Sequence, residues 1–141
     1  MAFIVDSNVF IGMERRGLGI AELPRLGPSE PVALASMTAA ELLIGVARSV
    51  HPARKTARAA FVEAIFQRLP TLPFDLEAAR AHAQLWVDLA ASGTPIGPHD
   101  MLIAAIARSN GYAVMTDNVG EFRRVAGLAV IQPTWPTEVA R

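Results

Sequence analysis

The feature that most constrains this chain is a short apolar run, Phe3-Ile4-Val5, that passes directly into a carboxylate, Asp6. Consecutive apolar residues of this kind, without alternation, are typical of a strand that is buried on both faces. A carboxylate at the end of such a strand is costly unless another group pairs with it. Asp6 is therefore the first candidate for a functional residue.

Strands and helices alternate along the rest of the chain. We expect strands at residues 3–5, 32–35, 72–74, 112–115 and 128–131, and helices from Ser7 or Asn8 toward Arg16 and at residues 38–49, 53–69, 75–92 and 99–110. This order predicts an α/β fold, in which a parallel sheet carries helices on both faces. Asp75 should cap one helix that Gly93 ends, and Gly111 should end the next. The segment from 133 to 141 is too proline-rich for a core element.

The composition narrows the class of protein. With 141 residues, of which 52% are hydrophobic, we expect one globular domain over residues 1–141. Cysteine is absent, which excludes disulfides, thiol chemistry and cysteine-ligated zinc. The 13 basic and 13 acidic side chains balance, so binding of nucleic acid needs a local patch. No signal peptide or bilayer-spanning run is evident, so we expect a cytoplasmic protein with no membrane partner.

Two further carboxylates, Glu41 and Asp100, lie in apolar surroundings like those of Asp6. Each has an ordinary structural explanation. Asp6 could cap the first helix, Glu41 could form a capping box with Thr38, and Asp100 could favour the positive end of its helix dipole. Taken singly, these explanations are about as good as functional ones.

Taken together, the three carboxylates favour a functional interpretation. Asp6 and Glu41 follow strands, and Asp100 begins a helix that runs antiparallel to the sheet, so all three should reach the same sheet edge. At ~4 Å separation and an effective dielectric near 20, each pair of like charges costs on the order of 4 kcal/mol. A cation would offset this cost. Because all the ligands are oxygens, magnesium or manganese is favoured over zinc.

A fourth polar segment, Thr116-Asp117-Asn118, follows the predicted strand that ends at Met115 and should reach the same edge. It brings a hydroxyl, a carboxylate and an amide there. An ordinary polar turn explains the segment equally well when it is considered alone.

In this order, these residues resemble the PIN-domain ribonucleases, and most closely the toxins of bacterial VapBC toxin–antitoxin pairs. The resemblance rests on VDSNVFIG at the start, the TAAELLIGV helix, PHDMLIAAIARSNG, and VMTDNVGEFRRVAGL near the end. The first motif is weak alone and the third is fairly specific. The four motifs in order cover nearly the whole chain.

The resemblance implies a PIN-like fold with a five-stranded parallel sheet, and an acidic pocket that binds divalent metal and cuts RNA. By motif position, the acidic set is Asp6, Glu41 and Asp100, with Asp6 and Asp100 as the most direct metal ligands. The family has a fourth acidic position, two residues after the motif threonine. In this chain that position is Asn118, as in some family members, and the carboxylate of Asp117 comes one residue before it. Whether either residue fills that position stays open. The supporting residues are Ser7, Asn8 and Thr116.

The expected chemistry depends on magnesium, with manganese as a substitute, which generates a nucleophile from water near neutral pH. A carboxylate without full metal contact could accept the proton of that water. His99, beside Asp100, is interpreted as a residue of the helix start or loop.

Other readings remain. A haloacid-dehalogenase phosphatase or a receiver domain needs a second acid near Asp6 and a lysine at the site, but position 8 is Asn and the only lysine is Lys55. The pair His99-Asp100 is also found in histidine–aspartate phosphohydrolases, but those proteins are all-helical, whereas strands and helices alternate in this chain. The remaining alternative is a catalytically weak PIN-like domain that binds RNA or a protein without cutting.

A basic stretch between Leu42 and Val62 contains no acidic residue. It is either a solvated helical face or a patch that follows the RNA backbone. The candidate RNA-binding residues are Arg15, Arg16, Arg54, Lys55 and Arg58. The resemblance also implies a homodimer and a VapB-type antitoxin that lays an apolar helix into a groove and directs an arginine or lysine at the acidic pocket.

Overall fold

The centre of the fold is β1 (Phe3–Val5), which is buried along its whole length. In this computed structural model, which describes residues 1–137, the elements after β1 are α1 (Ser7–Arg15), the 3-10 helix η1 (Ile20–Leu26), β2 (Val32–Ala35), α2 (Ser36–Arg48), α3 (Pro52–Arg68), β3 (Thr71–Leu72), α4 (Leu76–Ser92), α5 (Pro98–Asn110), β4 (Ala113–Met115), α6 (Val119–Phe122) and β5 (Val130–Ile131). The expectation of a single domain over residues 1–141 extends to residues 138–141, which lie outside the described part.

The five strands form one sheet in the order β3-β2-β1-β4-β5, and every neighbouring pair is parallel. β1 pairs with β2 on one side and with β4 on the other, so that Ile4 lies opposite both Ala33 and Val114. The predicted α/β fold with a five-stranded parallel sheet is confirmed. Because all strands point the same way, the residues that follow β1, β2 and β4 emerge at one edge.

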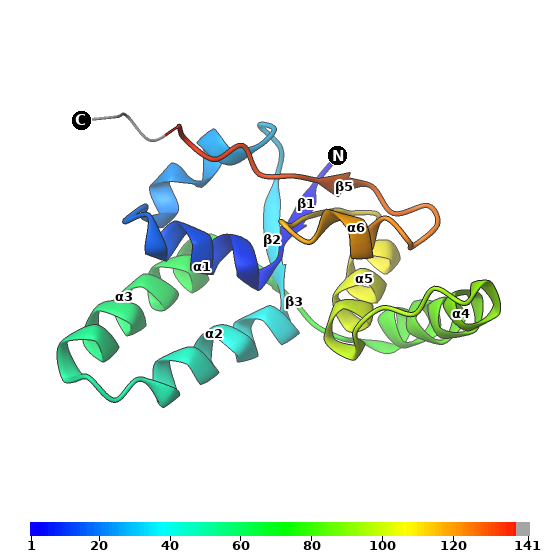
Figure 1. Cartoon of the computed structure of the whole chain (residues 1–141), viewed down its shortest axis with the longest axis horizontal. Coiled ribbons are helices and arrows are strands. Elements are labelled where there is room, and N and C mark those ends of the chain that lie inside the picture. Colours follow the sequence, from blue (N-terminus) through cyan, green and yellow to red (C-terminus); the bar gives the residue numbers. More distant parts are fainter. Residues whose placement is uncertain (138–141) are drawn as a thin grey trace.

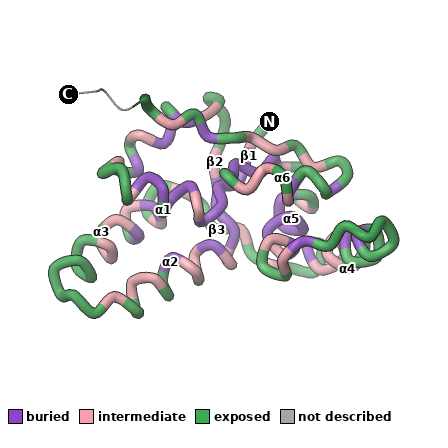
Figure 2. Tube along the Cα trace, viewed as in Figure 1, coloured by how far each residue is buried: buried purple, intermediate pink, exposed green. Residues whose placement is uncertain are grey.

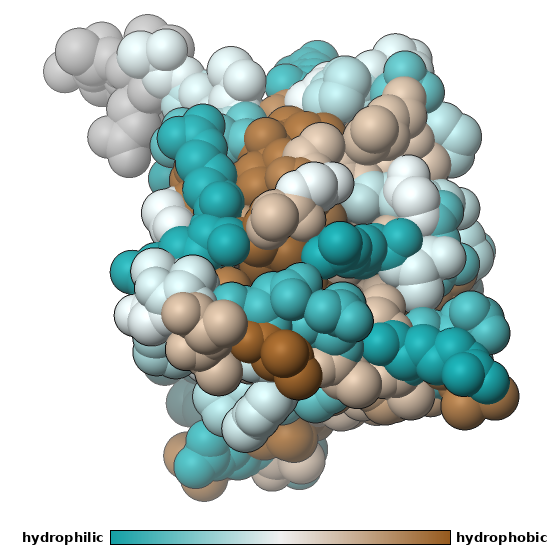
Figure 3. Space-filling model, turned by 90° about the vertical axis from the view of Figure 1, so that its right-hand side faces the viewer, coloured by the Kyte–Doolittle hydropathy of each residue, from teal (hydrophilic) through white to brown (hydrophobic). Residues whose placement is uncertain are grey.

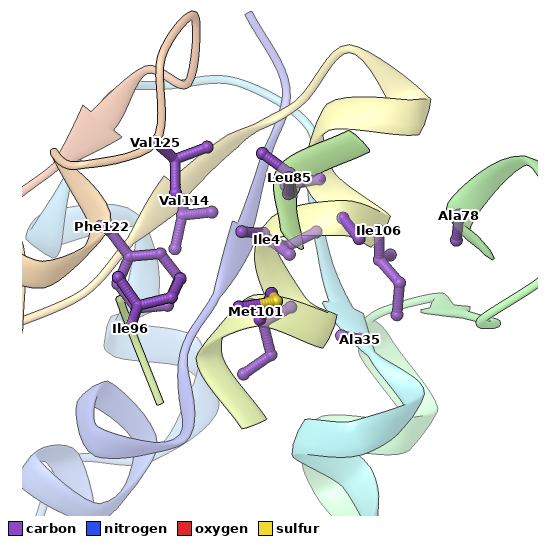
Figure 4. Packing of buried hydrophobic residues seen from close by; sticks show 14 of the residues in the cluster. Ile4, Ala35, Ala78, Leu85, Ile96, Met101, Ile106, Val114, Phe122 and Val125 are labelled. Atoms are coloured by element: carbon purple, nitrogen blue, oxygen red, sulfur yellow. The ribbon is translucent and has the colours of Figure 1, made fainter. Parts of the chain in front are cut away.

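Helices cover both faces of the sheet (Figure 1). Ile4 packs into a cluster with residues of α4 and α5, whereas its neighbours Phe3 and Val5 pack into a second cluster with residues of α1, η1 and α3. This alternation follows from the two-residue period of a strand. Figure 4 shows the first cluster, in which Ile4 lies among side chains of α5 that include Met101 and Ile106.

Burial follows the same layers. The central strands β1, β2 and β4 are almost entirely buried, whereas the edge strands β3 and β5 are partly exposed and α3 and α4 are exposed along their outer faces (Figure 2). Seen from the α4 side, hydrophobic and hydrophilic side chains are interspersed over the surface (Figure 3). Within residues 1–137, no helix is both long enough and apolar enough to cross a membrane.

One helix start agrees with an explanation that the sequence offered, and another does not. α1 begins at Ser7, and Asp6 caps it, since Oδ1 of Asp6 accepts the Ser7 N–H over 2.8 Å. α2 begins at Ser36, after Ala35 at the N-cap, so Thr38 lies inside the first turn. The capping box of Thr38 with Glu41 was therefore wrong.

The remaining helix ends agree with the sequence. Oδ1 of Asp75 accepts the Ala78 N–H over 2.9 Å at the start of α4. Gly93 and Gly111 end α4 and α5 with φ values of 66° and 71°, in the left-handed region that favours glycine.

One strand assignment was wrong. The edge strand covers Thr71–Leu72, so Pro73 lies just outside the ladder, as the missing N–H of proline requires. The segment from 133 to 137 forms no helix or strand, as predicted, and residues 138–141 of that prediction lie outside the described part. Pro133 is nevertheless buried, and Trp135 packs against the second cluster, so the absence of regular structure does not prevent burial.

Candidate active site

The site begins where β1 and β4 end. Asp6 follows β1, and Thr116 follows β4. The Asp6 N–H donates to the Met115 carbonyl over 2.9 Å, which continues the ladder by one step. The Thr116 hydroxyl donates to Oδ2 of Asp6 over 2.9 Å. The parallel pairing of two strands thus brings together residues 110 positions apart.

Asp6 is only 4% exposed, although it carries a carboxylate. Burial raises its pKa, the hydrogen bonds from Thr116 and the Ser7 N–H lower it, and the negative charge of Glu41 raises it further. The net direction is upward. Hydrogen bonds alone therefore do not compensate fully for the burial of this charge.

Glu41 reaches the site from α2 and is held at both oxygens. The Ser7 hydroxyl donates to Oε2 over 2.8 Å, and Nε2 of His99 lies 3.1 Å from Oε1. Ser7 belongs to α1 and His99 to α5, so the Glu41 carboxylate joins three helices. The interpretation of His99 as a residue of the helix start is incomplete, because its ring also contacts an acidic residue of the candidate site.

Asp100 lies in the first turn of α5 and is the most strongly perturbed carboxyl group. Burial raises its pKa to about 7, together with the charges of Asp6, Glu121 and Glu41. Asp6, Glu41 and Glu121 are therefore each close enough to Asp100 for their negative charges to raise its pKa. The structure brings together the three acids that the sequence singled out.

Glu121 is the acidic residue that sequence reasoning missed. It comes from α6, and its Oε1 accepts the Gly97 N–H at the start of α5. Its Oε2 accepts an N–H of Asn118 over 2.6 Å, and the two hydrogen bonds lower its pKa. The sequence signal that could have found Glu121 is its spacing of three residues from Asn118, because this spacing puts the two side chains on one face of a helical turn. We had interpreted this segment only as a connection between strands.

Asn118 and Asp117 point in different directions. Nδ2 of Asn118 donates to Oδ2 of Asp100 over 3.3 Å, so Asn118 faces the acidic residues. Asp117 is exposed, and its Oδ1 accepts the indole N–H of Trp135 over 3.1 Å. Of the two candidates for the fourth acidic position, the amide is the one that contacts Asp100.

The remaining supporting residues surround the Thr116 hydroxyl. Nδ2 of Asn8 donates to it over 3.2 Å, and the Asn118 N–H donates to it over 2.9 Å. A hydroxyl that already accepts two hydrogen bonds has its proton free for one acceptor. The Thr116 proton is accordingly directed at Asp6.

The candidate RNA-binding residues are in three kinds of surroundings. Arg54 and Lys55 are exposed at the start of α3. Arg58 forms an ion pair with Glu14, with Nη2 3.1 Å from Oε1 and Nε 3.2 Å from Oε2. The guanidinium of Arg16 stacks 3.9 Å above the ring of Trp135.

Arg15 lines a groove of about 230 Å³ between α1, α2 and α3. Of the four carboxylates of the site, Glu41 lines this groove, together with several apolar side chains. The lining residues are Ile11, Glu14, Arg15, Glu41, Leu42, Gly45, Arg58, Phe61 and Val62.

The chemistry of the donor atoms supports a metal ion at this site, although the side chains do not form a complete set of ligands. As the side chains lie in residues 1–137, no three His, Asp or Glu residues enclose a common point closely enough to hold an ion. The donor set nevertheless consists of carboxylate and amide oxygens, which suit magnesium and manganese. Burial, and after it the charges of Asp6, Glu121 and Glu41, raise the pKa of Asp100, and a cation would offset both effects.

Comparison with known families agrees with this geometry. The family model described as PIN domain matches residues 3–128. The chain belongs to the PIN domain family. Each of the acidic residues described above lies inside the matched range.

Several members of the PIN domain family are similar over nearly their whole length. "Ribonuclease VapC1" of Rickettsia felis is 35% identical over 133 residues, which cover 93% of this chain and 96% of that protein. "tRNA(fMet)-specific endonuclease VapC" of Salmonella typhimurium is 35% identical over 131 residues, covering 92% and 96%. A solved structure of DNA-bound VapBC from Salmonella typhimurium superposes with a TM-score of 0.80 at 34% identity, covering 94% of this chain and 98% of that one. Within the PIN domain family, this chain groups with the VapC proteins.

Proposed function

We propose that this chain is a metal-dependent endoribonuclease and the toxin of a VapBC-type toxin–antitoxin pair, acting on RNA in the cytoplasm. The observation that carries this proposal is the state of Asp100. Burial and three neighbouring carboxylates raise its pKa to about 7. Such a concentration of negative charge is typical of a site that holds a divalent cation. The names of the VapC relatives support a nuclease activity.

Asp6 and Asp100 would hold the ion most directly, with Glu41 and Glu121 beside them. When bound, magnesium or manganese offsets negative charge on the scissile phosphate and makes water a stronger nucleophile near neutral pH. Zinc is disfavoured because the donors are oxygens and cysteine is absent.

The residues of the chain have separate roles in this proposal. Thr116 orients Asp6, and Ser7 with His99 orients Glu41. A carboxylate of the site without full metal contact could accept the proton of the attacking water. The proposal therefore needs no histidine as the base.

A VapB-type antitoxin is the proposed partner. The groove next to Glu41 offers apolar side chains, such as Ile11, Leu42 and Phe61, to an apolar helix. An arginine or lysine of the antitoxin that reached past Glu41 would neutralise the carboxylates and oppose metal binding. The homodimer implied by the family resemblance is part of this proposal, and light scattering of the purified protein tests it.

The rival candidate is a PIN-like domain that binds RNA without cutting it. The observation that favours it is Asn118, an amide beside Asp100 where a further carboxylate would strengthen a metal site. Both candidates predict RNA binding, but only the endoribonuclease predicts cleavage, so a cleavage assay separates them.

The test is cleavage of a panel of structured RNAs, including total tRNA with initiator tRNA, by the purified chain. We expect discrete cuts in magnesium or manganese, no cuts in chelator, and no cuts by an Asp100→Asn variant prepared in parallel. RNA that is bound but left intact in magnesium and in manganese would overturn the endonuclease proposal in favour of the binding domain.

A further inference from the structure

Trp135 lies in a slot that the surface of α1 provides for it. A β-carbon at Gly12 would come within 2.8 Å of two ring atoms of Trp135, so only glycine leaves room for the indole. Arg16 covers the other side, with its guanidinium carbon 3.9 Å from the ring centre. Nη1 of Arg16 also donates to the Gly12 carbonyl over 3.0 Å, which fixes the guanidinium. The indole is therefore held from two sides.

The backbone before Trp135 is also anchored. The Thr134 N–H donates to the Leu26 carbonyl over 2.8 Å, at the end of η1. Pro133 is buried. This segment crosses the molecule beside α1 and η1 (Figure 1). The position of the indole is thus set by contacts with two separate parts of the chain, α1 and the end of η1.

From this slot, the indole N–H is directed at the loop that follows β4. It donates to Oδ1 of Asp117 over 3.1 Å. The Asp117 N–H donates to Oδ1 of Asn8 over 3.2 Å, which fixes the amide plane of Asn8. Nδ2 of Asn8 in turn donates to the Thr116 hydroxyl over 3.2 Å.

The last link reaches the acidic site. Because the Thr116 hydroxyl accepts from Asn8 and from the Asn118 N–H, its proton is left for Oδ2 of Asp6. A continuous series of hydrogen bonds therefore connects Trp135 with Asp6. Apart from Asp6, the series contains none of the four carboxylates Asp6, Glu41, Asp100 and Glu121.

We propose that Trp135 is a positioning residue, which through Asp117, Asn8 and Thr116 fixes the orientation of the Asp6 carboxylate. The inference rests on the proposed nuclease function, since it assigns Asp6 to the metal site. It also assigns Asp117 a role as the acceptor for the indole, in place of a role as a metal ligand. Misplacement of a reacting group by a fraction of an ångström lowers turnover more than substrate binding.

The first measurement does not depend on activity. The chain has two tryptophans, Trp86 and Trp135, so an amide correlation spectrum contains two indole signals. Asp117→Ala should shift the Trp135 signal and leave the Trp86 signal unchanged. A calorimetric titration with Mn²⁺ should show that Trp135→Phe and Asp117→Ala bind Mn²⁺ more weakly than the parent chain does.

The second measurement is kinetic. Trp135→Phe keeps a ring between Gly12 and Arg16 but removes the N–H, and we expect kcat to fall about tenfold with KM nearly unchanged. Asp117→Ala should show the same loss, and the double variant should be no worse than either single variant, because both remove one hydrogen bond. Asp117→Asn keeps an acceptor oxygen and should lose less than Asp117→Ala. Trp86→Phe removes an indole N–H from α4 and should behave as the parent.

Three results would overturn the proposal. Trp135→Phe could match the parent in both kcat and Mn²⁺ affinity. The losses of Trp135→Phe and Asp117→Ala could add in the double variant. Asp117→Asn could be as impaired as Asp117→Ala, which would make the charge of Asp117 the important property. If the parent chain cuts no RNA, the proposed function fails, whereas Mn²⁺ affinity and the indole signals still decide the positioning role.

Discussion

Asn118 donates from Nδ2 to Oδ2 of Asp100 across 3.3 Å, so an amide lies beside a carboxyl group whose pKa burial and neighbouring charges raise to about 7. The same amide donates to Glu121 over 2.6 Å. Asn118 therefore relieves repulsion between two acids that a carboxylate at this position would increase.

Asn118→Asp tests this balance. The substitution adds a negative charge between Asp100 and Glu121 and removes both hydrogen bonds from the amide. We expect a lower melting temperature in chelator, together with tighter Mn²⁺ binding by calorimetry. An unchanged melting temperature and an unchanged affinity would mean that position 118 does not belong to the electrostatic cluster.

Asp100→Asn should abolish RNA cleavage and also remove growth arrest when the chain is produced without a partner. Its melting temperature in chelator should rise, because one of four repelling charges is lost. Magnesium at a hundredfold excess over its dissociation constant should stabilise the parent by roughly 2.7 kcal/mol and the variant much less. Growth arrest by both versions alike would show that the acidic site does not cause toxicity.

Asp6→Asn provides the matched comparison. It also removes one charge and should abolish cleavage and the response to magnesium. However, both oxygens of Asp6 accept hydrogen bonds, from Ser7 N–H and from the Thr116 hydroxyl. An amide would turn an N–H toward one of these donors, so we expect a smaller rise in melting temperature than for Asp100→Asn. A larger rise, measured in chelator, would contradict this account of the Asp6 hydrogen bonds.

The stability of the metal-free protein should depend on pH through Asp100. Its folded pKa of about 7 exceeds the ordinary value of 3.8, so the folded state binds more protons than the unfolded state between these values. The free energy of unfolding should therefore fall as the pH rises from about 4 to 7. Asp6 acts in the same direction, since its pKa is also raised.

Urea unfolding in chelator at several pH values measures this slope. Asp100→Asn should have a flatter slope in the same window, and this difference isolates Asp100, because the substitution leaves every other ionisable side chain in place. Equal slopes in the parent and the variant would exclude Asp100 as the group responsible.

The candidate RNA-binding residues of α3 are of two kinds: Arg54 and Lys55 are exposed to solvent, whereas Arg58 forms an ion pair with Glu14. Replacing both Arg54 and Lys55 by alanine should reduce the salt dependence of RNA binding by about one to two units of slope, with cleavage chemistry intact. Arg58→Ala breaks the ion pair with Glu14 and should mainly lower the melting temperature. If the double variant keeps the salt slope of the parent, the start of α3 is only a solvated face.

The layered fold could be predicted from the sequence because its signals are local. Buried strands are short apolar runs, and Asp75, Gly93 and Gly111 act on their own helices. The predicted capping box at Thr38 was wrong because the start of α2 is not decided by local sequence. The hydroxyl of Thr38 is fully buried and has no hydrogen-bond partner in the described part of the chain, so tertiary packing decided where α2 begins.

The acidic site could be predicted in part. Asp6, Glu41 and Asp100 follow from sheet topology, which sends the ends of parallel strands to one edge. The contacts of Glu121 and His99 depend on how α5 and α6 approach each other and α2. The slot for Trp135 depends on Gly12, more than a hundred residues earlier. No periodic pattern encodes such contacts.

The pairing of β1 with β4 has a consequence for synthesis of the protein. Phe3 lies opposite Ala113, so the central strand has only one neighbour until the last quarter of the chain has left the ribosome. At the usual rate of translation, Asp6 precedes Glu121 by roughly 6 to 23 s. A nascent chain therefore cannot assemble all four carboxylates into one site before residue 121 has been added. Any partner that must restrain the finished protein has that interval in which to accumulate.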